Sequence, residues 1–559
     1  MKADIPLPSF ERPDAVYLAP LGGLGEIGMN LMVIIHRKQA ILIDCGVMFP
    51  DASMPGIDVI VPNVEFLTKA NIEIVGIILT HGHEDHIGAI AYVIDDLKYP
   101  PVYSSGFTAA LAEDRLREAG KLSRTKVHSV KVPGQFEVGP FKIRSIQVTH
   151  SIVDSMGLII ETPVGVLVHS GDFKMDTDPL DGRRIDEDAL TKAGKKQPLL
   201  LMSDSTNVER PGWSKPEAEV GESLRKIISE IRQGKILIAV FASNIHRIQH
   251  IADAATKSGR KLGFVGRAMQ SNVEVAIRLG HLKLDRKDII LLSDVKKYRP
   301  EEVALIVTGT QAEPRSALYR MSLNDHPDVD ILPGDTVIMS SRHIPGNEKN
   351  ISHLINNLYR REAEVIDSDS APVHASGHAY QEELKKLIEW VQPKFFLPAH
   401  GEYRMLVKHF RLAKSVLPNL RGLVAENGDL LELTANSFEK IGYVPSGKIF
   451  LDEGSTDIHE ELLRDRRKLA HTGVVVVSLV VDKHTGEILE GPDFDIRGVN
   501  DEVDLDGLRS DLLTRFREFS SEARKDDVEV EEEFRRVTRR FFRKANGVKP
   551  VVIPLIYEV

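Results

Sequence analysis

"THGHEDHIGAI", residues 80–90, carries three histidines and an aspartate, at His81, His83, Asp85 and His86. The residues before it, IEIVGIIL, are β-branched and apolar and predict a buried strand, and those after it have apolar positions at helical spacing. Imidazole and carboxylate groups are metal ligands, and this set is too large for one tetrahedral zinc ion. The stretch therefore predicts two metals side by side, on a turn that opens a helix.

Three further strand-like runs end on residues of the same kind. FKIRSIQVTH ends at His150, VGVLVHSGD ends at Asp172, and KFFLPAHGE carries His400. A lone histidine after a strand is more often structural, but side chains at strand ends on one edge of a sheet can converge. With the 80–90 stretch they give five histidines and two aspartates, enough for two metals that share a bridging carboxylate.

Composition limits the class of protein. The 559 residues predict two to four domains, and 42% hydrophobic with 28% charged residues is typical of a soluble globular protein. No apolar run reaches membrane-spanning length, and the first residues do not resemble a signal peptide. Because Cys45 is the single cysteine, no internal disulfide can form, and we expect a cytoplasmic protein away from the membrane. The net charge of −10 argues mildly against nucleic-acid binding without excluding it.

GGLGEIG near the N-terminus is a formal dinucleotide-binding match, with Gly23, Gly25 and Gly28 at the required spacing and Asp44 further on. That motif requires a helix after the glycines. The residues that follow are rich in valine and isoleucine and are interrupted by a polar HRKQ turn. They predict a β-hairpin instead.

The motifs resemble a known family. THGHEDH, His150, SGD and PAHGE are similar to the metallo-β-lactamase fold in its nucleic-acid-processing β-CASP group. PLGGLGEIGMN, FASNIHRIQ, TGTQAEP, IPGNEKNI and VHASGH resemble ribonuclease J more narrowly. The resemblance runs from about Leu18 to the C-terminus. It departs from the family pattern at Ala312, where glycine is expected after Gln311, and at Ala379-Tyr380 after SGH.

The resemblance implies an α/β fold, in which a metallo-β-lactamase αββα sandwich carries an inserted β-CASP domain and a small C-terminal α/β domain. The predicted parts are the first part of the metallo-β-lactamase domain at 1–210, the β-CASP domain at 211–365, the second part at 366–450, a linker at 451–468 and the C-terminal domain at 469–559. Within the insertion, helical PEAEVGESLRKIISEIRQG and NIHRIQHIADAATKSG alternate with strand-like KILIAVF and KLGFV. That alternation predicts parallel strands, and Asn244 is a candidate helix cap.

The resemblance also implies how the ligands divide between two Zn²⁺ per chain, which Mn²⁺ could replace. One zinc would take His81, His83 and His150, the other Asp85, His86 and His400, and Asp172 would bridge them. Asp44 would brace the histidine loop without binding a metal itself.

We take Asp85, His378 and Asp204 as the catalytic residues. Two metals activate water and neutralise charge on a phosphodiester, but the leaving oxygen needs a proton from elsewhere. His378 is the candidate donor, because the family places it over the scissile phosphate. The resemblance makes Asp204 an active-site acid near His400 that orients a group or relays a proton, although a helix or turn cap is the alternative for this residue.

The implied function is a zinc-dependent ribonuclease with 5′-to-3′ exonuclease and endonuclease activity. It would act in mRNA decay and rRNA maturation and would prefer single-stranded RNA with a 5′-monophosphate. Free backbone N–H groups in FASN, the hydroxyls of Ser243 and Ser376, and a ring N–H or a charge from His374 would suit that phosphate. The expected substrate-binding set is Ala242, Ser243, Asn244, His374, Ala375, Ser376, Gly377 and His378.

Two alternatives remain, another β-CASP nuclease and an RNA-binding scaffold with a dead site. The family also implies a homodimer or homotetramer, with other RNA-decay proteins as further partners. Apolar strands such as VVIPLIYEV in the region 461–559 have no catalytic task and could serve that association. The basic run Arg535–Lys544 could contact RNA or be a solvated helix face.

Overall fold

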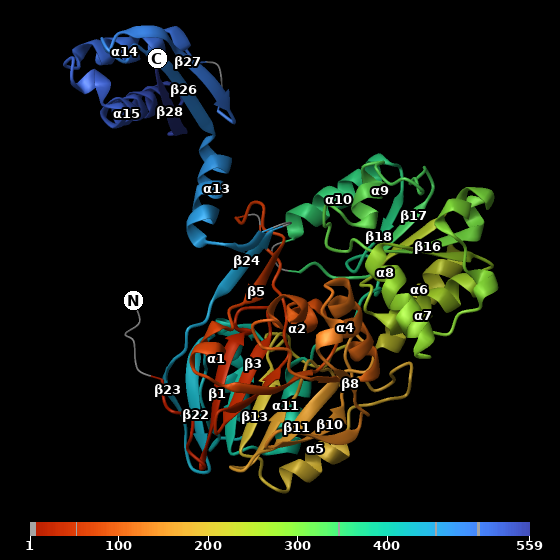
Figure 1. The fold of residues 1–559 in the computed structure, drawn as a ribbon. Coiled ribbons are helices and arrows are strands. Elements are labelled where there is room, and N and C mark those ends of the chain that lie inside the picture. Colours follow the sequence, from red (N-terminus) through yellow and green to blue (C-terminus); the bar gives the residue numbers. More distant parts are fainter. Residues whose placement is uncertain (1–6, 52, 345–346, 453–454, 500–502) are drawn as a thin grey trace. The chain divides into compact units, whose positions relative to one another are not determined.

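Figure 1 shows the computed structural model of the chain, which describes residues 7–51, 53–344, 347–452, 455–499 and 503–559. The described residues form two compact units. The first takes its residues from 1–49 and 60–448, and the second from 50–59 and 449–559. No helix in the described ranges is long and apolar enough to cross a membrane.

The first unit is built on two facing sheets. One has the order β23 (Phe438–Tyr443), β22 (Asp429–Thr434), β1 (Ala15–Gly22), β3 (Leu31–His36), β4 (Gln39–Ile43), β6 (Glu73–Leu79), β7 (Val102–Ser104), β8 (Val127–Ser129). The other has the order β21 (Arg421–Gly422), β19 (Phe395–Ala399), β13 (Leu200–Asp204), β12 (Val166–His169), β11 (Met156–Glu161), β10 (Phe141–Gln147), β9 (Gly134–Val138). Their inner faces share one apolar core, in which Leu18 and Ile34 from one sheet pack with Leu158 and Leu397 from the other.

Helices cover the outer faces of this sandwich, as expected. On the second sheet, Ile159, Val168 and Phe396 pack against three helices, α5 (Glu187–Gly194), α11 (Gln381–Val391) and α12 (Tyr403–Val416). The connections between strands of the first sheet also carry helices: α1 (Glu65–Lys69) precedes β6, α2 (Glu84–Ile87) and α3 (Ile90–Val93) lie between β6 and β7, and α4 (Gly106–Glu118) lies between β7 and β8. Figure 1 shows the resulting layers.

The direction of the strands places the predicted ligands. β10, β12, β13 and β19 run the same way, since β11 is antiparallel to β10 and β12, and β13 is parallel to both β12 and β19. Their carboxyl ends therefore lie on one edge of the sheet, where His150, Asp172, Asp204 and His400 stand.

The glycine-rich segment leads into a hairpin and not into a helix, which confirms the prediction. β3 and β4 pair antiparallel, and Arg37 and Lys38 between them both have positive φ (48° and 60°). A two-residue turn of that kind matches the twist of the flanking strands.

The helix expected after the histidines is broken into α2 and α3. Ala89 N–H donates to Cys45 O (2.9 Å), while Asp85 O accepts from Asn30 N–H (2.9 Å). The backbone bond that would continue the helix is thus replaced by one bond to the loop after β4 and one to the residue before β3. This break fixes Asp85 and His86 against the neighbouring strand.

The inserted segment forms the predicted parallel sheet. Its order is β15 (Lys261–Val265), β16 (Val303–Val307), β14 (Ile236–Ala239), β17 (Thr336–Met339), β18 (Glu364–Ile366). Its helices are α6 (Glu217–Glu230), α7 (Ile245–Lys257), α8 (Arg267–Arg278), α9 (Ala317–Ser322) and α10 (Glu348–Arg360). Pro345 and Gly346 of the IPGNEKNI motif lie outside the described residues. Ala312 adopts φ 58°, a left-handed conformation in which the glycine expected there is less strained.

The second unit holds a three-stranded sheet with two helices. The sheet order is β27 (Ile488–Arg497), β26 (Val474–Val481), β28 (Val551–Glu558), and α14 (Leu505–Glu518) and α15 (Asp527–Asn546) pack on one face. The segment 451–468, expected to be a linker, contains part of β24 (Lys448–Asp452), β25 (Ser455–Ile458) and much of α13 (Glu460–Thr472). It takes this regular form because Leu451 and Ile458 are buried. Glu453 and Gly454 lie outside the described residues.

Candidate metal centre

Asp44 holds the loop that follows β6 and carries the histidines. Its carboxylate accepts from Thr80 N–H (2.7 Å) and from His86 Nδ1 (2.8 Å). Asp44 is buried at the end of β4 and has a positive φ of 63°. These contacts are those expected of a residue that braces the histidine loop.

His81, His83 and His150 form the first cluster. His83 Nδ1 lies 3.1 Å from His81 Nε2 and 3.2 Å from His150 Nε2. The other nitrogen of each ring lies beside an oxygen, Thr80 Oγ1 at 3.1 Å, Ser243 Oγ at 3.0 Å and Gly377 O at 2.7 Å respectively. With the outer N–H groups donating, three lone pairs converge, which is how metal-bound histidines are held.

Electrostatics keeps these three rings ready to bind a cation. Burial lowers the pKa of His83 to about 4 and holds the pKa values of His81 and His150 well below the usual range. The rings are therefore neutral at pH 7, the form in which imidazole binds a metal.

Asp85, His86 and His400 form the second cluster. Asp85 Oδ2 lies 3.4 Å from His86 Nε2 and 3.4 Å from His400 Nε2. His400 Nε2 is buried and, among the described residues, has no hydrogen-bond partner. An orphaned buried nitrogen is costly unless a ligand satisfies it, so this atom fits a metal. Burial disfavours charge on His400, but the carboxylates of Asp172 and Asp85 outweigh it and raise its pKa to about 10.

Asp172 lies between the two clusters. Its Oδ1 accepts from His400 Nδ1 (2.9 Å), and its Oδ2 lies 3.2 Å from His86 Nε2 and 3.7 Å from His81 Nε2. Burial acts to raise the pKa of Asp172, but His400 and His86 outweigh it and hold that pKa well below its usual range. The anionic, central carboxylate suits a bridge between two cations.

His378 forms a pair with Asp204 beside the clusters. Its Nδ1 donates to Asp204 Oδ2 (2.8 Å), and its ring centroid lies 4.9 Å from that of His150. Burial lowers the pKa of His378, but Asp204 outweighs it, so the pKa is raised. Asp204 Oδ1 accepts from Thr206 N–H (2.9 Å), so this carboxylate both caps a turn and orients His378.

The structure brings the predicted substrate-binding loops to this centre, with changes of detail. Ser243 touches His83, while Ser376 Oγ accepts from Asn207 Nδ2 (2.7 Å). Gly377 is crowded by His150 and Ser151, since a Cβ there would come within 2.8 Å of His150 Cε1. Ala242 is half-buried and Ala375 is buried, and neither offers a polar side-chain group.

Two groups expected at the phosphate site have other roles or a narrower one in the structure. Asn244 N–H donates to Phe241 O, and the Asn244 side chain caps α7 by accepting from Arg247 N–H (3.1 Å), so these groups are not free for an anion. Burial, followed by the nearby charge of Arg247, lowers the pKa of His374 to about 3, so this ring is uncharged at neutral pH.

Two contact residues received no role from the sequence. Asn30 Nδ2 lies 3.1 Å from Asp85 O and 3.1 Å from His86 Nε2, and Asn207 holds Ser376. Asn30 is the last residue of PLGGLGEIGMN, and Asn207 follows SDST. Both lie in stretches that already stood out by composition, but no local pattern identifies their partners.

Four family models match the chain. They are the metallo-beta-lactamase superfamily at 25–200, the ribonuclease J beta-CASP domain at 233–358, the Zn-dependent metallo-hydrolase RNA specificity domain at 370–418, and the ribonuclease J C-terminal domain at 461–559. The chain is 38% identical to the ribonuclease J of Thermus thermophilus, over 98% of this chain and 96% of that one. The chain belongs to the ribonuclease J family. It is also 36% identical to ribonuclease J2 of Bacillus subtilis, over 98% of this chain and all of the relative.

Membership of the ribonuclease J family confirms the metallo-β-lactamase fold with a β-CASP insertion and makes the chain a metal-dependent RNA hydrolase. A solved protein of unknown function from Enterococcus faecalis shares the fold at 15% identity and a TM-score of 0.52, over 75% of this chain and all of that one.

Proposed function

We propose that this chain is a two-zinc ribonuclease that degrades RNA from a 5′-monophosphate end and also cuts internally. The observation that supports this most is the meeting of two ligand clusters at Asp172. Its setting would be the cytoplasm, in mRNA decay and rRNA maturation with other RNA-decay proteins, and Mn²⁺ could replace zinc. We also propose the domain boundaries expected from the sequence, which are 1–210, 211–365, 366–450, 451–468 and 469–559.

In this proposal His81, His83 and His150 hold one metal, Asp85, His86 and His400 hold the other, and Asp172 touches both. When bound, such a pair supplies an activated water and neutralises charge on the phosphodiester. The chain's residues do the rest. Asp44, Thr80, Ser243 and Gly377 keep the rings turned so that one nitrogen of each faces inward.

The 5′ phosphate would lie between the two loops that flank His83 and His150. Ser243 Oγ accepts from His83 Nε2, and Ser376 Oγ accepts from Asn207 Nδ2 and from His378 N–H (3.1 Å). Because each oxygen already accepts, each hydroxyl proton can be donated to an anion. In this proposal the space between the two loops fits one phosphate, and a triphosphate would be excluded by its size and charge.

Monophosphorylated RNA should therefore be degraded about tenfold faster from its 5′ end than triphosphorylated RNA, the effect of one charged hydrogen bond. Purified protein given 3′-labelled and 5′-labelled forms of one RNA reports both rate and direction. Ser376→Ala should erase much of the preference, while Ser229→Ala, on the exposed end of α6, should keep it. Equal rates for the two 5′ ends in the unmodified protein would refute the phosphate pocket.

Ser243→Ala is the less clean change at this pocket. Its hydroxyl contacts a proposed metal ligand, so the variant should lose preference and also some internal cleavage. Ser376→Ala is expected to leave internal cleavage closer to normal, because Ser376 contacts Asn207 and the His378 backbone and not a ligand ring.

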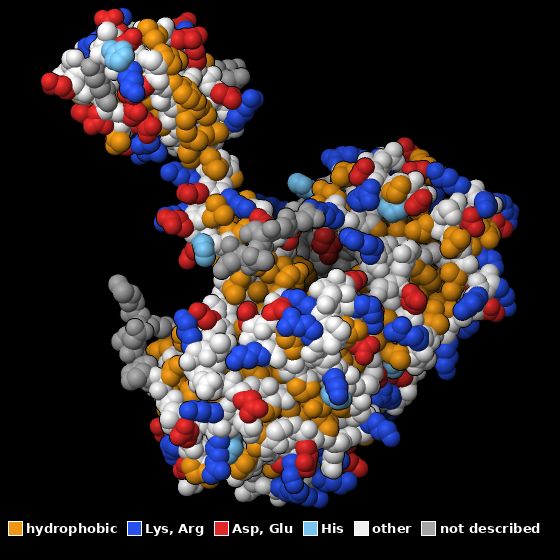
Figure 2. All heavy atoms as spheres, viewed as in Figure 1, with side chains coloured by type: hydrophobic (Ala, Val, Ile, Leu, Met, Phe, Trp, Pro, Cys, Tyr) orange, Lys and Arg blue, Asp and Glu red, His pale blue; other side chains and the backbone are white. Residues whose placement is uncertain are grey.

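The second unit offers a surface for the proposed homodimer or homotetramer. One face of its sheet is covered by α14 and α15, but Ile553, Leu555 and Tyr557 on β28 point to the other face and are 43%, 37% and 52% exposed. Val476 and Val480 of β26 lie beside them in register. Apolar side chains gather over this sheet in Figure 2. Exposed apolar sheet faces are typical of association sites.

Ile553→Lys with Leu555→Lys should shift the protein toward the monomer mass in light scattering, because two buried charges at an interface are unfavourable. Val528→Lys is the matched control, since Val528 is 77% exposed at the start of α15. Removal of residues 461–559 should have the same effect as the double change. An unchanged mass after both alterations would count against this face.

A further inference from the structure

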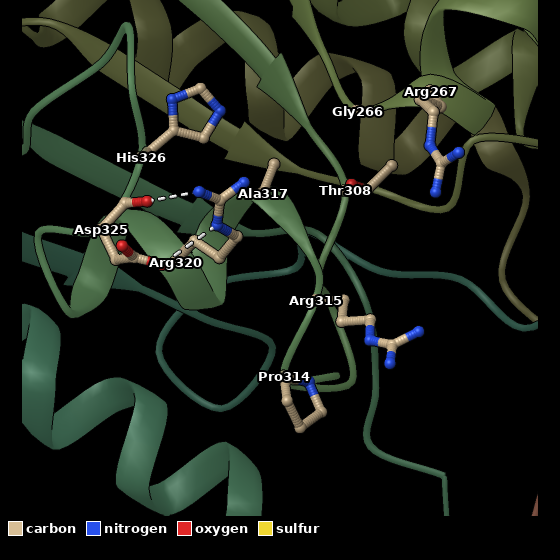
Figure 3. A pocket seen from close by; sticks show the side chains of 9 residues that line it. All are labelled: Gly266, Arg267, Thr308, Pro314, Arg315, Ala317, Arg320, Asp325 and His326. Atoms are coloured by element: carbon tan, nitrogen blue, oxygen red, sulfur yellow. Dashed lines mark hydrogen bonds and ion pairs between the residues drawn. The ribbon is translucent and has the colours of Figure 1, made fainter. Parts of the chain in front are cut away.

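The inserted sheet carries a cavity that the proposed mechanism does not use. It has a volume of about 540 Å³ and lies where β15 and β16 end, at Gly266 and Thr308 (Figure 3). Ligands of parallel α/β sheets bind in the crevice at the carboxyl ends of the strands, and small-molecule sites have about this volume. None of the residues proposed to bind metal or the 5′ phosphate lines it.

The cavity floor is shaped by Gly266. Its φ is 114°, and a Cβ there would come within 2.4 Å of Thr308 Oγ1, so a larger residue would close the gap between the strand ends. Gly266 also caps α8, a helix of 12 residues, and within the described part of the chain its N-terminus has no side-chain cap. These N–H groups and the helix dipole favour a negative charge.

Three guanidinium groups line the cavity. Figure 3 shows Arg320 and His326 on one side of Thr308, and Arg267 on the other, with Arg315 below them in this view. Arg320 is fixed by Asp325, to whose backbone O it donates (2.6 Å) and whose Oδ2 lies 3.3 Å from Nε. Arg267 is exposed and makes no ion pair with the described residues. Asp325 is the one carboxylate in the lining, so positive charge prevails.

His326 adds a neutral donor to the same wall. Its Nδ1 accepts from the backbone N–H groups of Asp328 and Val329 (both 3.3 Å), which leaves the proton on Nε2. Burial and the charge of Arg320 lower the pKa of His326, so the ring is uncharged at neutral pH. Planar guanidinium groups and N–H donors together are suited to phosphate oxygens.

We propose that this cavity binds the phosphate group of a nucleotide, either free in solution or within an RNA strand. The strand alternative rests on the proposed nuclease function, whereas the free nucleotide does not. β16 lies directly beside β14, whose carboxyl end leads to Ser243, so an RNA strand bound at one strand end has a second phosphate site close to it.

The test compares the unmodified full-length protein with Arg267→Gln/Arg315→Gln. Arg278→Gln is the control for loss of a guanidinium as such, because it removes one positive charge from the exposed last turn of α8, outside the cavity. ADP and inorganic phosphate are titrated by calorimetry, and a short single-stranded RNA with a 3′ fluorophore by anisotropy. RNA binding is measured in EDTA, so that it is read without cleavage.

The double variant should bind its ligand at least about tenfold more weakly, while Arg278→Gln stays within about twofold. Loss of ADP or phosphate binding identifies a free nucleotide as the ligand. Loss confined to RNA, with a salt dependence flatter by about 0.7 per lost contact, identifies a phosphate of the strand. Equal affinities of all three proteins for all three ligands would overturn the proposal. An inactive nuclease would not, because no readout requires cleavage.

Discussion

His83→Ala should reduce RNA cleavage by about a thousandfold while RNA binding changes little. His83 lies at the centre of the first cluster, since its Nδ1 is within 3.2 Å of both His81 Nε2 and His150 Nε2. In the proposed centre, one metal would lose a ligand without this ring, and Ser243 would lose its contact with it. A bound metal supplies several kcal/mol of transition-state stabilisation, and ~1.4 kcal/mol corresponds to a factor of ten.

Metal analysis and single-turnover cleavage check this expectation together. The unmodified protein should carry about two divalent ions per chain, and the variant should carry fewer. His353→Ala, on the exposed face of α10, is the control for loss of a histidine as such. Full activity in His83→Ala, or in unmodified protein that holds one ion or none, would be incompatible with a two-metal site.

The local part of this centre could be predicted from the sequence because its information is local. A buried strand, a turn and a helix start fix the positions of His81, His83 and His86, and β6 and α2 lie where the pattern indicates. His150, Asp172 and His400 can be predicted in a similar way, because each stands at the end of an apolar, strand-like run. These strand ends lie on one edge of the sheet because of how β12, β13 and β19 pair. The sequence of a single strand does not show with which strand it pairs.

The contacts that orient the rings could not be predicted in this way. Ser243 is 160 positions from His83, and Gly377 is 227 positions from His150. The first bond depends on how the inserted sheet packs against the sandwich, and the second on where the chain runs as it leaves that sheet. The contacts made at the ends of single elements could not be predicted either, for the same reason. The N–H of Asn244 donates within its own loop, and the charge suggested for His374 is removed by burial.

His378→Ala should lower cleavage of RNA by about a hundredfold or more, the usual contribution of a positioned general acid. The ring is held by Asp204 at 2.8 Å and stands over His150, so it can donate a proton to the leaving sugar oxygen. Metal content should stay near that of the unmodified protein, since His378 is not one of the proposed ligands. A purely structural role would instead lower metal content and activity together.

If His378 is the proton donor, the effect of its removal should depend on whether the leaving group needs a proton. Bis(p-nitrophenyl) phosphate releases an anion that needs no proton, so His378→Ala should cleave it within about threefold of the normal rate. Asp204→Asn keeps the acceptor for Thr206 but not for His378, and it should cost about tenfold on RNA. Because both residues act through one proton, the double variant should be no worse than His378→Ala alone. Equal losses on both substrates, or additive losses in the double variant, would show that the proton comes from another group.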